Sequence, residues 1–204
     1  TKTAEMLPQE YAREAYKRGL ALEKSLGVNP FKFGVIGSTD AHTALASTEE
    51  SNYFGKVTPL EPSADPIRFE EPIIGRAAPA GNQILASHIS SGALAAVWAR
   101  ENTREAIWDA FARKEVFATT GSRLRVRVFG GFVFKADDLF RSDFPSYGYQ
   151  AGVPMGGDLR TAPAGKSPAF LVRAIRDPDG ANLERIQVIK VWLDAQGKTH
   201  ERMW

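Results

Sequence analysis

The sequence predicts an α/β segment followed by a module of antiparallel β-strands. A helical pattern over residues 8–26 is followed by a short apolar run over residues 31–37, which is the order of elements in an α/β unit. From residue 122 onward, apolar and polar residues alternate, as in strands that bury one face. We therefore expect two parts, residues 1–121 and residues 122–204, with a boundary between Gly121 and Arg123.

The first part begins with an amphipathic helix and a buried strand. Apolar residues recur at helical spacing among charged ones in residues 8–26, and Gly27 stands where a helix C-cap is expected. The run 31–37 is apolar and partly β-branched and stops at Gly37, which is typical of a strand buried in a parallel sheet. Residues 38–83 are rich in Ser, Thr, Pro and Gly, and loops of this length are often functional.

The remaining elements follow from capping residues and alternation. Asn102 or Thr103 can cap a helix that runs to about Lys114, and residues 115–121 predict a short strand and a turn. Period-two alternation recurs over residues 123–128, 169–176 and 185–193. Glycine-containing turns separate these runs, which indicates hairpins in an antiparallel, sandwich-like module.

Composition excludes several kinds of protein and partner. The chain has 204 residues and no cysteine, so disulfides, thiolate nucleophiles and cysteine-based zinc sites are excluded. Lys and Arg number 26 against 24 acidic residues without a long basic run, which gives no indication of nucleic-acid binding. No apolar stretch approaches the roughly 18 residues that would suggest a membrane span, so we expect no membrane contact from this chain. The three histidines, His42, His88 and His200, require any metal site of this chain to use carboxylates as well.

The strongest local signal is the pair Asp40 and His42, directly after the predicted strand. In α/β sheets, functional side chains gather where strands end, and residues two apart in an extended segment point the same way. A carboxylate oxygen and an imidazole nitrogen together suit Zn²⁺, Mn²⁺ or Fe²⁺. The alternative is that Asp40 caps a turn while His42 makes only local hydrogen bonds.

Other polar residues are weaker candidates. Arg123 is positioned to bind the anionic part of a substrate, although a solvated strand residue has the same pattern. Glu49 and Glu50 in the long loop fit either a metal site or an exposed loop face. His88 lies among serines but without the Gly-x-Ser-x-Gly signature, so we expect a structural role for it.

Several separated segments together resemble one family. The segments FGVIGSTDAHTALASTEESNYFGK, AAVWARENTREAIWDAFARKEVFATTGSRLRVRVFGGF, VPMGGDL and FLVRAIRDPDGANLERIQVIKVWLDAQGKTHERM resemble the C-terminal portion of the domain-of-unknown-function 3604 family. That family is similar to the polymerase-and-histidinol-phosphatase (PHP) superfamily of metal-dependent phosphoesterases, whose fold is a distorted α/β barrel. In that superfamily a late Asp-x-His pair supplies two metal ligands, and Asp40 and His42 match it.

The resemblance implies a metal-dependent hydrolase of phosphate or related small-molecule esters, with a divalent Mn, Zn or Fe ion. The superfamily's first His-x-His pair and its intermediate His and Glu ligands have no counterpart in this sequence. We therefore expect a C-terminal fragment of such a barrel that is inactive in isolation, so enzymatic activity of this chain stays uncertain. The alternative is a β-rich accessory or interaction module without catalysis. A truncated barrel leaves open strand edges, which predicts a homo-oligomer.

Overall fold

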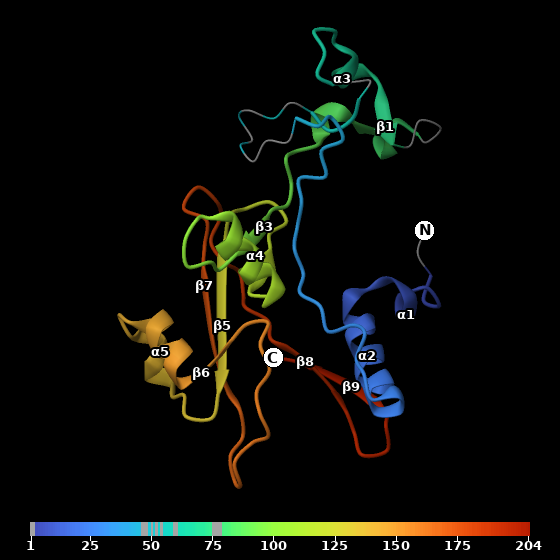
Figure 1. The fold of residues 1–204 in the computed structure, drawn as a ribbon. Helices are drawn as coiled ribbons and strands as arrows, with labels where there is room; N and C mark the ends of the chain where they lie inside the picture. The colour runs from blue at the N-terminus through green and yellow to red at the C-terminus, as the bar shows by residue number, and fades with distance from the viewer. Residues whose placement is uncertain are drawn as a thin grey trace. The chain divides into compact units, whose positions relative to one another are not determined.

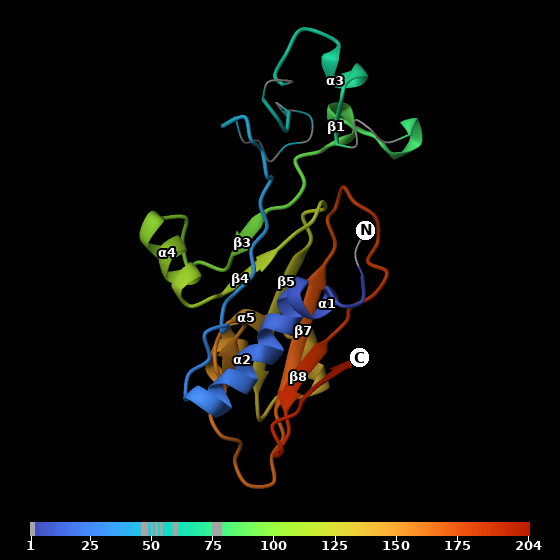
Figure 2. The ribbon, with the colours of Figure 1, turned by 90° about the vertical axis from the view of Figure 1, so that its right-hand side faces the viewer.

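A computed structural model describes residues 3–45, 49, 51, 53, 55–58, 61–74 and 79–204. The chain combines helices with small antiparallel sheets, as Figures 1 and 2 show. It divides into two compact units, of which one comprises Thr1–Phe33 with Leu183–Trp204 and the other comprises Gly34–Asn182. Each unit is described separately below.

The first unit pairs an N-terminal helix with a C-terminal hairpin. Helix α2 lies against strands β8 and β9, which pair with each other in antiparallel fashion. Arg13 on α2 contacts Glu201 on β9 at 2.6 Å, and Lys17 lies 3.3 Å from the same carboxylate. The elements of this unit are α1 (Leu7–Glu10), α2 (Ala12–Leu26), β8 (Ile189–Leu193) and β9 (Thr199–Met203).

The described residues of the second unit form three small antiparallel sheets. Strand β1 (Pro72–Ile74) pairs with β2 (Ile84–Leu85), and β3 (Ala95–Val97) pairs with β4 (Val116–Ala118). The third sheet has the order β6–β5–β7. Its strands are β5 (Arg125–Gly131), β6 (Gly152–Pro154) and β7 (Ala169–Ile175); the helices are α3 (Ile67–Glu70), α4 (Arg104–Ala112) and α5 (Phe144–Ala151), with short 3₁₀ turns at Ala80–Asn82, Ala86–His88 and Ala136–Phe140.

The main core of this unit lies between the third sheet and α5. Phe129, Phe134, Phe144 and Leu171 are at most 9% exposed and form one cluster. The rings of Phe129 and Phe144 meet edge to face with centroids 5.5 Å apart, a favourable aromatic geometry. Phe129 comes from the central strand β5 and Phe144 from the start of α5, so this contact fixes the helix on the sheet.

Several elements confirm the sequence predictions. The predicted first helix is present, although Tyr11 separates α1 from α2, and it ends at Gly27, whose φ of 76° gives the expected left-handed cap. The side chain of Thr103, rather than Asn102, caps α4 by accepting a hydrogen bond from Ala106 N at 3.3 Å. The alternating runs in the last third form the antiparallel strands β5, β7 and β8.

The predicted buried parallel strand over residues 31–37 is wrong for this structure. The segment belongs to no strand, and Phe33, Val35 and Ile36 are 41%, 45% and 52% exposed. Every strand pair in the described part of the chain is antiparallel, and those strands close no barrel. An apolar run needs neighbouring strands on both sides to become a buried strand, and this segment has no strand pairing.

The short strand β6 depends on the small size of Gly152. A methyl group added there would lie 2.6 Å from Phe134 Cζ and would overlap the carbonyl oxygen of Gly130. We expect Gly152→Ala to lower the free energy of unfolding by about 1–3 kcal/mol in urea denaturation, because overpacking forces the backbone apart. Gly81→Ala is the control, since its added methyl group meets nothing within 4 Å. Equal stability of the two variants would contradict the tight β5–β6 approach.

Candidate metal-ligand site

Asp40 and His42 lie in a tight turn that hydroxyl side chains stabilise. Ser38 Oγ accepts a hydrogen bond from Asp40 N at 2.9 Å, and Thr39 Oγ1 accepts one from Ala41 N at 3.4 Å. Asp40 has a φ of 54°, in the left-handed region that Asp tolerates better than most residues. The segment is therefore a turn at Asp40 instead of the extended chain that the sequence predicts.

The side chains of Asp40 and His42 nevertheless meet. His42 Nε2 lies 3.0 Å from Asp40 Oδ1, and the two side chains are 59% and 69% exposed, respectively. The pair thus places one carboxylate oxygen and one imidazole nitrogen side by side on an accessible surface. The turn and the local hydrogen bond fit both hypotheses for this motif, the one in which Asp40 and His42 only stabilise the turn and the one in which they bind a metal.

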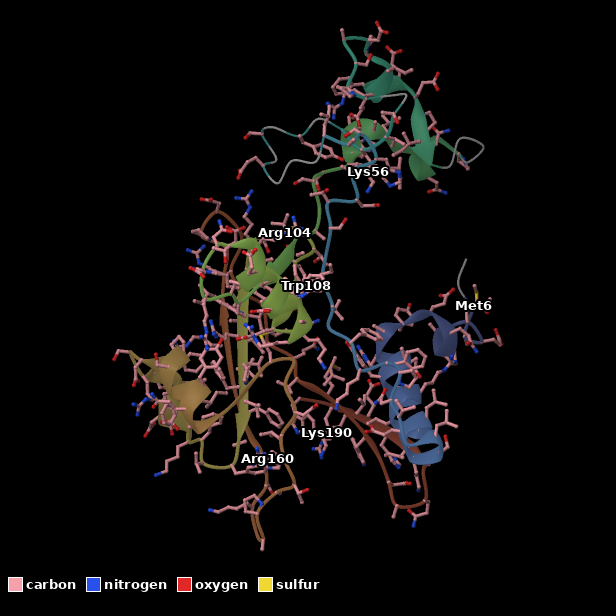
Figure 3. The ribbon with its side chains drawn as sticks, viewed as in Figure 1. Met6, Lys56, Arg104, Trp108, Arg160 and Lys190 are labelled. Carbon is pink, nitrogen blue, oxygen red and sulfur yellow. The ribbon has the colours of Figure 1, made fainter. Side chains whose placement is uncertain are left out.

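Lys56 is the third member of this group, and no sequence motif identified it. Its Nζ lies 2.5 Å from Asp40 Oδ2, and its side chain is only 18% exposed. Figure 3 labels Lys56. The backbone of Lys56 is held on both sides, because its carbonyl accepts from His42 N at 2.7 Å and its N–H donates to Glu61 Oε2 at 2.7 Å. Glu61 is itself buried, with a side chain 2% exposed, and pairs with Arg68 at 3.0 Å.

The electrostatics favour an ionised Asp40. The hydrogen bond from Lys56, and after it the hydrogen bond from His42, lowers the pKa of the Asp40 carboxyl below its usual range. A carboxylate that stays ionised is the form that binds a metal cation. Lys56 therefore extends to lower pH the range in which Asp40 carries a negative charge.

The donor set of this turn suits a divalent cation only in part. Within the described residues, no group of three or more His, Asp or Glu side chains is arranged to hold a metal. A catalytic zinc site takes about three protein ligands, so the pair lacks at least one. The ammonium of Lys56 occupies a position beside the carboxylate where a metal cation could also bind.

Arg123 lies two residues before strand β5. Its guanidinium contacts Glu49 at 2.8 Å, and its backbone N–H donates to Asp177 Oδ2 at 2.6 Å. That backbone hydrogen bond is the main cause of the lowered pKa of Asp177. Glu49 thus pairs with Arg123, and Glu50 lies outside the described residues.

The other histidines take part in local structure. His88 Nδ1 accepts a hydrogen bond from Leu85 N at 3.4 Å, within the turn that contains it. His200 Nε2 lies 2.7 Å from Asp194 Oδ2 and its ring stacks on Trp192, inside the β8–β9 hairpin. Neither contact brings these histidines to the Asp40–His42 pair.

Comparison with known proteins gives a family. The family model described as protein of unknown function (DUF3604) matches residues 1–204. The chain belongs to the DUF3604 family. Neither the search of curated proteins nor the search of solved structures finds a match. In the described part of this DUF3604 chain, no helix has the length and apolar character of a membrane span.

A second polar cluster of this DUF3604 chain is centred on a buried carboxylate. Glu115 is 1% exposed, and its carboxylate has three partners. One oxygen lies 3.2 Å from Arg113 Nη2, and the other lies 3.5 Å from Arg127 Nη2 and accepts a short hydrogen bond from the Tyr149 hydroxyl. The guanidinium of Arg127 also stacks 4.2 Å above the Trp98 ring. Burial, and then this hydrogen bond, raises the pKa of Tyr149.

These residues line a cavity of about 970 Å³ between α4, β5 and α5. Sequence analysis missed the cluster, because Glu115 reads as the polar start of a strand and Arg127 as an exposed position of an alternating strand. Only the tertiary contacts show that both are buried. The alternation of Arg125, Arg127 and Phe129 in β5 was the one available signal, since it places Arg127 on the same face as the core residue Phe129.

Removing the charge of Glu115 tests whether this cluster holds the unit together. We expect Glu115→Gln to lower the free energy of unfolding by about 3 kcal/mol, because the guanidinium of the largely buried Arg127 loses its counter-charge. Glu105→Gln on the exposed face of α4 should change it by less than about 0.5 kcal/mol. Thermal and urea denaturation of both variants measures the difference, and a Glu115→Gln chain as stable as the control would show that the cluster is dispensable.

Proposed function

We propose that this chain supplies two ligands, Asp40 and His42, to the metal centre of a hydrolase acting on phosphate or related esters. The observation that carries the proposal is the meeting of Asp40 Oδ1 and His42 Nε2 at 3.0 Å on an accessible turn, with a cationic side chain on the second carboxylate oxygen. An oxygen and a nitrogen donor in this arrangement are the ligand types that Mn²⁺, Zn²⁺ and Fe²⁺ accept.

The resemblance of this family to the PHP superfamily supports the same reading. Enzymes of that superfamily bind metals inside a distorted α/β barrel, and the Asp-x-His spacing of Asp40 and His42 matches one of their ligand pairs. Within the described residues, no third His, Asp or Glu side chain joins the pair, so a complete metal centre requires ligands beyond Asp40 and His42. We propose that the pair alone does not catalyse hydrolysis.

Each residue has a defined part in this proposal. Asp40 binds through its ionised carboxylate, and His42 binds through neutral Nε2, the atom that now faces Asp40. A divalent metal supplies an activated water and neutralises developing negative charge on an ester. Arg123 binds an anionic group of the substrate with the guanidinium that Glu49 now occupies.

The competing candidate is an accessory module without catalysis. It is favoured by the core of Phe129, Phe134, Phe144 and Leu171, which is built entirely from residues after the predicted boundary at 121. That boundary and the sandwich-like arrangement stay predictions. The two candidates differ in metal binding, which the accessory module does not require.

Metal binding by the chain tests the proposal directly. We expect Asp40→Ala and His42→Ala each to weaken Mn²⁺ or Zn²⁺ binding at least about tenfold, since each removes one of two donors. Asp179→Ala and His88→Ala remove the same chemical groups elsewhere and should leave binding unchanged. Equilibrium dialysis with elemental analysis measures the bound metal. The corresponding activity assay measures metal-dependent hydrolysis of aryl phosphate mono- and diesters by a protein that contains all the metal ligands. Unchanged binding in both site variants would refute the assignment.

Self-association is a further part of the proposal. Val35 and Ile36 lie outside any strand and are about half exposed, at 45% and 52%. Exposed apolar side chains favour association with a second chain. We expect concentration-dependent oligomers in light scattering, shifted toward monomer by Val35→Ser with Ile36→Ser. Val133→Ser with Phe140→Ser, also at exposed positions, should not shift them; a monomer at every concentration would contradict the expectation.

A further inference from the structure

The cavity beside Glu115 has one wall of carboxylates. Glu105 and Asp109 lie four residues apart on α4, and both line this cavity of about 970 Å³. Residues at this spacing share one face of a helix. Glu101, four residues before Glu105, lines the cavity as well. Among the described residues, none of these three carboxylates has an ion-pair partner, so all three can bind a cationic group.

Positive charge gathers around Glu115. The guanidinium groups of Arg113 and Arg127 share this one carboxylate. Arg113 uses Nε and Nη2 for Glu115 and for the carbonyl of Trp98. Arg127 reaches Glu115 and Tyr149 through Nη2. In the part of the chain that the structure describes, Nη1 of either arginine has no hydrogen-bond partner, so the cluster keeps one positive charge in surplus.

Arg113 is the accessible member of this cluster. Its side chain is 47% exposed, whereas that of Arg127 is 14% exposed. Asp109 and Glu105 precede Arg113 by four and eight residues, which corresponds to about 6 Å and 12 Å along a helix axis. The cavity therefore offers a guanidinium group and, one or two helical turns away, unpaired carboxylates.

The remaining lining gives the cavity an apolar part. Apart from Arg100 and Tyr149, it consists of Trp98, Ala99, Ala106 and Pro154. The volume is in the range of small-molecule sites. A ligand that is only anionic is repelled by the carboxylate wall, and one that is only cationic is repelled by the surplus charge of the arginines. The cavity thus favours a ligand that carries both charges on an apolar chain.

We propose that this cavity binds an ω-amino acid, a zwitterion whose ammonium and carboxylate groups are joined by an aliphatic chain. The carboxylate binds the guanidinium of Arg113, which suits planar, two-oxygen recognition. The ammonium group binds Glu105 and Asp109. The separation of these side chains along α4 selects a chain of several carbons over an α-amino acid, whose two charges are only three bonds apart.

The probe for this site is 6-aminohexanoate, compared with hexanoate, hexylamine and glycine. Chemical-shift titration of the isotope-labelled chain by nuclear magnetic resonance measures each affinity. We expect 6-aminohexanoate to bind at least about tenfold more tightly than the other three, because each of these lacks one charge or the separation between the charges.

Variants of the two charged ends locate the binding. Glu105→Gln with Asp109→Asn should reduce the affinity for 6-aminohexanoate to that for hexanoate. This double variant removes no ion pair of the described residues, so it leaves the Glu115 cluster in place. Asp137→Asn with Asp179→Asn, which removes two exposed carboxylates outside the cavity lining, is the matched control and should leave the affinity unchanged.

Arg113→Gln should reduce the affinity to that for hexylamine, with Arg160→Gln as its control, and thermal denaturation checks that each variant is folded. Preferential binding of 6-aminohexanoate that the Glu105 and Asp109 double variant abolishes supports the site. Equal binding of all four probes, no shifts at any soluble concentration of 6-aminohexanoate, or binding that the double variant leaves unchanged overturns it. None of these outcomes depends on metal binding at Asp40 and His42.

Discussion

The buried carboxylate of Glu115 is the interaction on which the larger unit depends most. It directly precedes β4 and receives partners from the end of α4, from β5 and from α5, so that one charge joins four elements. A buried carboxylate is costly without partners, so each of these elements must keep its place for the charge to be tolerated. Arg127 adds a second constraint, because the same guanidinium that pairs with Glu115 stacks on Trp98. The segment that carries the Phe129 core is thereby tied to the residues before it.

Asp40 and Glu115 show how the environment gives two carboxylates of the same chain different exposure and different partners. Glu115 is 1% exposed and closed in by arginines and a tyrosine, which suits a fixed structural charge. Asp40 is 69% exposed and contacts one flexible lysine and one histidine, both of which can rearrange. A cation from solution can therefore reach the carboxylate of Asp40, whereas removing a partner of Glu115 is costly. This contrast is why the proposed chemistry is assigned to the exposed turn and not to the larger cavity beside Glu115.

Local signals predicted the elements whose structure is set locally. Gly27 ends a helix because its left-handed conformation favours glycine, and Thr103 begins one because its hydroxyl satisfies a free N–H group. The alternation around β5 and β7 likewise predicted strands, although in β5 it is Arg127, and not Val126 or Val128, that shares a face with the buried Phe129. The run 31–37 has an equally clear pattern, but a parallel strand needs partners from elsewhere, and periodicity carries no information about whether they are present. Helix α5 escaped notice because its eight residues, FPSYGYQA, contain a proline and a glycine.

The residues of the candidate site likewise fall into those that a local motif predicts and those that only the fold brings together. The sequence identified Asp40 and His42 because a short motif brings them together, and a turn held by Ser38 and Thr39 is sufficient to make their side chains meet. The sequence could not identify Lys56, because it lies sixteen positions after Asp40. Two hydrogen bonds of its backbone, from His42 N to its carbonyl and from its N–H to Glu61, hold it close to the carboxylate. A site's ligands can thus be encoded in a motif while the charge that balances them is encoded in the fold.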